Sequence, residues 1–160
     1  MSAGDYRAVA LRIRQELVAL QAVSDRARGA WAEATGGGAD YHVDATALNL
    51  HGFYAGLERL FVIVAERIDE SLPTGANWHQ ELLQQMSAEL PGVRPAVVSS
   101  TSAADLERFR GFRHVVRNVY AYVLDPRRVG ELVDALPSTF AAARSELAEF
   151  ADALEAIARS

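Results

Sequence analysis

Apolar side chains recur at steps of three and four residues along most of the chain, as they do on the packed face of an α-helix. This spacing predicts one long helix over residues 6–34, which the three glycines at 36–38 terminate. A second helix is predicted from about residue 44 to residue 69, antiparallel to the first. The positions expected to face the core are Val9, Ile13, Leu17, Leu20, Ser24, Ala27, Leu50, Phe53, Leu57, Leu60, Phe61 and Val64.

Three further helices follow a polar loop. One is predicted over residues 78–90 with Asn77 as its N-cap, because asparagine favours that position. The next begins in the serine-rich run before Ala103 and continues to about Tyr122. The last fills the rest of the chain, with a kink or a restart at Pro137. The pattern therefore predicts an all-α fold, a bundle of four to five helices.

Composition narrows the class of protein. The 160 residues, half of them hydrophobic, suit a single domain over 1–160. The chain has no cysteine, which excludes disulfides, thiolate metal sites and cysteine nucleophiles. Neither a signal-peptide layout nor a membrane-length apolar run is present, so a cytoplasmic protein without membrane association is expected. Histidines and acids do not recur at metal-ligand spacing, and no phosphate loop occurs, so no metal and no cofactor are expected.

The net charge is −5, so affinity for nucleic acid has to come from a local patch. The fourth predicted helix carries such a patch, although all sixteen basic residues of the chain are arginines and their number alone says little. A helical wheel separates a core-facing stripe from this cationic face. The stripe consists of Phe109, Phe112, Val115, Val116, Val119 and Val123. The cationic face consists of Arg110, Arg113 and Arg117, with His114 and Tyr120 at its edges and Asn118 beyond His114.

Three interpretations of this face stay open. Arginine binds phosphate bidentately, so Arg110, Arg113 and Arg117 are candidates for contact with phosphate or nucleic acid. No acid lies between Glu107 and Asp125, so acids from elsewhere in the fold are a second way to balance the charge. The third interpretation is an ordinary solvated helix face.

Other polar residues have a functional and an ordinary interpretation. On the second helix, His51, Tyr54 and Glu58 share one side, and the favoured interpretation is a packed histidine and a surface acid, with a cleft or dimer role as the alternative. Trp78 is expected in the core or an interface. His79 either lines a cleft or is an ordinary residue at a helix start.

The segment FRHVVRNVY resembles the signature helix of the HEPN superfamily, and specifically of HepT-like ribonuclease toxins. That motif has an arginine, a polar residue, a short spacer, a histidine, one further residue and a tyrosine. Segments 47–61, 72–86 and 110–126 resemble one HepT-like subgroup, in the right order along the chain. The resemblance implies an all-helical homodimer whose signature helices meet across a cleft and cut RNA without a metal. It also implies a minimal nucleotidyltransferase (MNT) antitoxin, which can add AMP to the motif tyrosine.

Carried over residue by residue, Arg113 matches the motif arginine and Tyr120 the motif tyrosine, the possible site of AMP addition. Asn118 stands where the motif has histidine, and asparagine cannot transfer a proton near neutral pH. His114, one turn earlier, is the candidate that replaces it. The resemblance therefore predicts the endonuclease toxin of a toxin–antitoxin module. The alternatives are a catalytically inactive HEPN-type module that binds RNA, a nucleotide or a partner, and a structural bundle whose arginines are only ion-paired.

Overall fold

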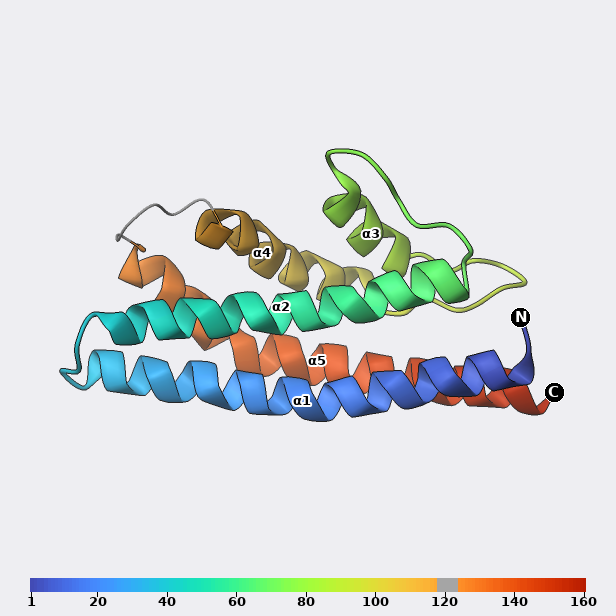
Figure 1. Cartoon of the computed structure of the whole chain (residues 1–160), viewed down its shortest axis with the longest axis horizontal. Helices are drawn as coiled ribbons and strands as arrows, with labels where there is room; N and C mark the ends of the chain where they lie inside the picture. Colours follow the sequence, from blue (N-terminus) through green and yellow to red (C-terminus); the bar gives the residue numbers. More distant parts are fainter. Residues whose placement is uncertain (118–123) are drawn as a thin grey trace.

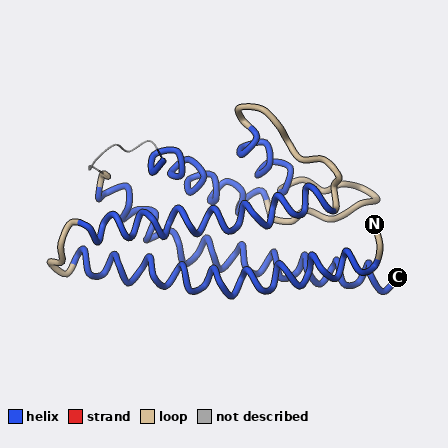
Figure 2. Tube along the Cα trace, in the orientation of Figure 1, coloured by secondary structure: helices blue, strands red, loops and turns tan. Residues whose placement is uncertain are grey.

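The computed structural model of the chain describes residues 1–117 and 124–160 (Figure 1). Within these ranges the secondary structure is helical, without a strand, and one isolated β-bridge joins Leu90 and Arg94 (Figure 2). The prediction of an all-α, five-helix bundle is confirmed. The helices are α1 (Ala3–Thr35), α2 (Tyr41–Arg67), α3 (Trp78–Met86), α4 (Ser100–Arg117) and α5 (Pro126–Arg159).

Three long helices make the body of the molecule. α1 packs along both α2 and α5 and runs antiparallel to them, so the two chain termini lie at the same end (Figure 1). α3 and α4 lie over α2, on the side away from α1 (Figure 1). Every residue that the apolar spacing assigned to the core of α1 and α2 is buried. α2 is therefore the central helix, with α1 on one side and the α3–α4 layer on the other.

Glycines allow α1 to approach both of its neighbours closely. A Cβ placed on Gly56 of α2 would lie 2.6 Å from a methyl carbon of Leu20, and one on Gly130 of α5 would lie 2.7 Å from the Trp31 ring. At the start of α1, Ser2 and Asp5 form a reciprocal capping box that satisfies backbone amides of the first turn. Gly56 and Gly130 thus let α1 pack closely against α2 and α5 at these two points.

α3 is shorter than the sequence predicted. The expected helix over residues 78–90 ends at Met86, and Ser87 follows as its C-cap. Asn77 occupies the N-cap position, but its side chain makes no capping hydrogen bond. The early end has a physical cause in the next segment, because the Met86 carbonyl accepts hydrogen bonds from the amides of Val97 and Val98 instead of continuing the helix.

A buried ion pair organises that segment. The guanidinium of Arg94 is fully buried and donates to both carboxylate oxygens of Asp69, just after α2, at 2.5 and 2.8 Å. It also donates to the backbone carbonyls of Gln85, Ala88 and Pro95. The Gln85 amide donates to Asp69 at 2.7 Å. Arg94 therefore fastens the C-terminal end of α3 to the end of α2.

α4 and α5 follow the prediction with one difference. The apolar stripe of α4 is confirmed where it is described, with Phe109 and Phe112 buried and Val115 and Val116 packed against the core. The predicted end of this helix near residue 122 lies outside the described residues. α5 begins with Asp125 capping its first turn, and it runs through Pro137 without the restart that proline suggested. In the described part of the chain, no helix has the length and apolarity needed to cross a membrane.

Candidate active site between α3 and α4

A cleft of about 480 Å³ lies where the start of α3 meets the outer face of α4. α2 packs against both of these helices. The cleft carries four side chains able to hold or move charge in phosphodiester chemistry, two arginines and two histidines. Its lining residues are Ala76, Asn77, His79, Gln80, Arg110, Gly111, Arg113 and His114.

Glu58 of α2 connects the two sides of this cleft. Its Oε2 lies 2.7 Å from Nδ1 of His79, and its Oε1 accepts a hydrogen bond from Nη1 of Arg113. The residue is only 5% exposed, so the expectation of a surface acid is wrong. The physical reason is that a buried carboxylate is tolerated when each oxygen has a cationic or hydrogen-bonding partner.

The carboxylate of Glu58 fixes the tautomer of His79. An ionised carboxylate only accepts hydrogen bonds, so the ring nitrogen facing it carries the proton. Nη1 of Arg113 also lies 3.2 Å from Nδ1 of His79. Because Nδ1–H donates to Glu58, we interpret this distance as two donors converging on one carboxylate and not as a hydrogen bond between them. Whenever this ring is neutral, its lone pair is therefore on Nε2.

Two arginines of the cationic face, Arg110 and Arg113, are paired with acids of the same chain. Arg113 binds Glu58, and Arg110 binds Glu107 one turn earlier on α4, with Nε to Oε2 at 2.8 Å. The hydrogen bonds that Arg110 donates to Glu107 raise the pKa of Arg110 above its ordinary value, so this guanidinium stays charged. Among the three interpretations of the face, pairing with acids therefore holds for Arg110 and Arg113. Both side chains still line the cleft.

The remaining predicted site residues divide into two groups. His114 is exposed and lines the cleft with His79, so the structure brings two imidazoles to one hollow. Asn118 and Tyr120 lie outside the described residues, and the side chain of Arg117 is not described either. Trp78 is partly buried and packs against the core, with its ring 3.7 Å from that of His79, centroid to centroid.

Behind the cleft, Tyr54 lies completely buried. Burial and then the nearby Glu58 carboxylate raise the pKa of Tyr54 well above its ordinary value. Its hydroxyl and the Nε of Arg113 are buried without a hydrogen-bond partner among the described residues. The wall behind Arg113 is therefore a low-dielectric environment, in which Glu58 is the nearby countercharge.

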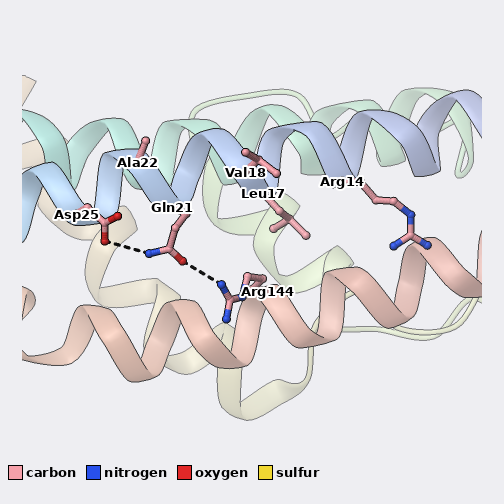
Figure 3. Close-up of a pocket in the computed structure, with 7 residues that line it drawn as sticks. All are labelled: Arg14, Leu17, Val18, Gln21, Ala22, Asp25 and Arg144. Atoms are coloured by element: carbon pink, nitrogen blue, oxygen red, sulfur yellow. Dashed lines mark hydrogen bonds between the residues drawn. The ribbon is translucent and has the colours of Figure 1, made fainter.

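A second hollow, of about 600 Å³, lies between α1 and α5 (Figure 3). Although it is larger, its polar groups are bound to one another. Arg144 donates to Gln21 at 2.9 Å, and Gln21 donates to Asp25 at 3.1 Å (Figure 3). Arg14 at its edge is paired with Asp152 and Glu155. No histidine lines this hollow, and its one carboxylate, Asp25, is held by Gln21.

Comparison with known proteins agrees with the motifs of the sequence. The family described as "HepT-like protein" matches residues 45–154, a range that includes α3 and α4 and nearly all of α2. No curated protein and no solved structure matches the chain. The match spans more than half of the chain, and its boundaries enclose every residue of the cleft. The chain therefore belongs to the HepT-like family of the HEPN superfamily.

Proposed function

We propose that this protein is the toxin component of a toxin–antitoxin module and that it cuts RNA in the cleft between α3 and α4 without a metal ion. The observation that supports the proposal most is the gathering of two arginines and two histidines around one hollow. Guanidinium groups match the charge and geometry of a phosphodiester, and imidazoles transfer protons near neutral pH. Membership of the HepT-like family supports the same function.

In this proposal Arg113 orients the scissile phosphate and neutralises its charge, and His114 transfers a proton. Arg110 and Arg117 hold the phosphates on either side, and Asn118 supplies hydrogen bonds instead of the proton transfer that a histidine would perform. No cofactor takes part.

The ion pairs of the cleft do not oppose phosphate binding strongly. The pair between Arg110 and Glu107 is partly exposed, so giving Arg110 to a phosphate costs about 0–1 kcal/mol. Arg113 keeps Glu58 on Nη1, and it has a second terminal nitrogen to offer to the substrate. Arg113 therefore acts as a guanidinium fixed in place before the RNA arrives.

The partners follow from the family. The protein acts as a homodimer in which the α4 helices of two copies face each other, because each cleft is built on the outer face of α4. An MNT-type nucleotidyltransferase is the cognate antitoxin and adds AMP to Tyr120. Light scattering at micromolar concentration tests the dimer, and a monomer there would contradict it.

A binding module without catalysis is the second candidate, and Asn118 in the place of the motif histidine favours it. One experiment separates the two. Purified protein is incubated with single-stranded RNA of mixed sequence in excess EDTA, beside His114→Ala and the control His42→Ala, which lies at the start of α2. RNA cleavage that His114→Ala loses and His42→Ala keeps supports the nuclease. RNA binding without cleavage by the wild-type protein would support the binding module.

A further inference from the structure

We propose that His79, held by Glu58, is the general base of the reaction, and that the cleft thus takes one proton-transfer group from α3 and one from α4. This inference rests on the proposed RNA cleavage. It assigns a catalytic role to a residue outside the signature helix and a positioning role to a carboxylate of α2.

The His79 ring is oriented by the residues around it. Its Nδ1 edge faces Glu58 at 2.7 Å, and Trp78 covers one of its faces at 3.7 Å between ring centroids. The side chain nevertheless retains 26% exposure and lines the cleft. The edge left to face the cleft is the one that carries Nε2. Because Nδ1 holds the proton, Nε2 is the nitrogen with a lone pair, which is the state that a base requires.

The Glu58 carboxylate lies behind the His79 ring. Glu58 is nearly inaccessible to solvent, and its two oxygens are occupied by His79 and Arg113. A carboxylate behind an imidazole fixes the ring and stabilises the imidazolium that forms when the ring accepts a proton. Glu58 itself is too enclosed to reach a substrate, so its role is to position His79 and Arg113 relative to each other.

The proposed reaction requires two proton transfers. Cleavage of RNA by its own 2′-hydroxyl needs one group to accept a proton and one to donate a proton. Asn118 does neither, and His114 alone supplies one of the two. His79 and His114 line the same cleft from different helices, with Arg113 also in the lining. The pair therefore completes the requirement with residues that the structure places together.

In the proposed cleavage step, Nε2 of His79 accepts the proton of the 2′-hydroxyl while the 2′ oxygen forms a bond to phosphorus. The bond from phosphorus to the 5′ oxygen breaks, and that oxygen takes a proton from the imidazolium of His114. The products are a 2′,3′-cyclic phosphate and a free 5′-hydroxyl. Proton exchange with water then restores both imidazoles, so no oxidant, reductant or metal is consumed.

The test uses the full-length protein and a labelled single-stranded RNA of mixed sequence, in EDTA. Single-turnover rates are measured for wild type, His79→Ala, Glu58→Gln and the control His42→Ala. Affinity is measured separately on the all-2′-deoxy strand, which lacks the nucleophile. His79→Ala should lower the rate by about 10² to 10⁴ while its affinity stays within about threefold. Added imidazole should restore part of this rate, and Glu58→Gln should lower the single-turnover rate by at least about tenfold.

The outcomes separate this inference from the proposed function. Wild-type cleavage that persists in His79→Ala would overturn the role of His79 and leave the nuclease intact. A lost rate that imidazole does not restore, together with lost affinity or lost helicity, would make His79 a structural residue and also overturn the inference. Wild-type protein that cuts no RNA would overturn the proposed function itself, and the catalytic role of His79 with it.

Discussion

Oε2 of Glu58 lies 2.7 Å from Nδ1 of His79, and this contact joins the middle of α2 to the first turn of α3. The other oxygen of the same carboxylate holds Arg113 of α4. Three helices thus meet at one buried acid. The contact holds the His79 ring at the start of α3, a helix of nine residues.

The pairing of Glu58 with Arg113 should be measurable in stability. Glu58→Ala leaves the Arg113 guanidinium, whose side chain is 19% exposed, without its countercharge. We expect the free energy of unfolding to fall by about 2–4 kcal/mol, somewhat less than for a completely buried pair. In a urea-denaturation cycle with Arg113→Ala and the double variant, the coupling energy should be about 1–3 kcal/mol. Additive effects would show that the two side chains do not interact.

The ion pair between Arg94 and Asp69 should be a main determinant of stability around α3. Arg94→Ala removes a buried charge, leaves Asp69 without its cationic partner, and takes a hydrogen bond from three backbone carbonyls. Its expected cost is about 3–5 kcal/mol. The control Arg14→Ala breaks exposed ion pairs between α1 and α5 and should cost about 1 kcal/mol or less. Equal losses in the two variants, measured by thermal or urea unfolding, would contradict this ranking.

Tyr54 predicts a dependence on alkaline pH. Its raised pKa means that the folded state holds the phenol proton more tightly than the unfolded state does. The associated stability is fully present below the ordinary tyrosine pKa of about 10 and is lost as the pH rises above it. Tyr54→Phe removes a buried hydroxyl without a described partner, so at pH 7 its stability should equal that of wild type or exceed it by up to about 1 kcal/mol.

Unfolding curves between pH 8 and about pH 11 provide the check. Above the ordinary tyrosine pKa, and only there, the stability of Tyr54→Phe should fall less steeply with pH than that of wild type. Parallel losses in wild type and Tyr54→Phe would show that Tyr54 does not contribute to the alkaline transition. A large destabilisation of Tyr54→Phe at pH 7 would show that its hydroxyl has a partner.

Two glycines in helices should respond to alanine in opposite directions. Gly29 of α1 has open space around its Cβ position, so Gly29→Ala should stabilise the protein by about 0.5–1 kcal/mol through helix propensity. At Gly130 the new methyl group would lie 2.7 Å from the Trp31 ring, so Gly130→Ala should destabilise by about 1–3 kcal/mol. If both variants shift the melting temperature upwards, α1 and α5 are not as closely packed as the structure indicates.

The long helices were predictable because their stripes are long and regular. In α1 and α2 the apolar spacing identified buried positions such as Ile13 and Phe53, and this depends only on the period of one helix. The length of α3 was not predictable in the same way. Its last turn is lost because the Met86 carbonyl accepts hydrogen bonds from the amides of Val97 and Val98, which lie outside the helix.

The site was predictable in part, for the same reason. A helical wheel placed Arg110, Arg113 and His114 on one face of α4, and all three line the cleft. It contained no information about neighbouring helices, so the pairing of Glu58 with Arg113 and His79 was not foreseen. The position of His79 in the cleft lining was one of the two interpretations of that residue. One signal was present in the sequence, because Glu58 shares the spacing of the buried Tyr54 and continues the apolar face of α2. The roles of Asn118, Tyr120 and Arg117 stay predictions.

The most direct measurement of the central proposal is the single-turnover rate of RNA cleavage in EDTA for wild type, Arg113→Lys and Arg14→Lys. Lysine keeps a positive charge beside Glu58 but lacks the planar guanidinium, and Arg14 lies away from the cleft, beside α5. We predict that Arg113→Lys lowers the rate by about 10-fold to 10³-fold and that Arg14→Lys leaves it unchanged. A wild-type rate retained by Arg113→Lys, or RNA left intact by the wild-type protein, would contradict the proposal that this cleft cuts RNA.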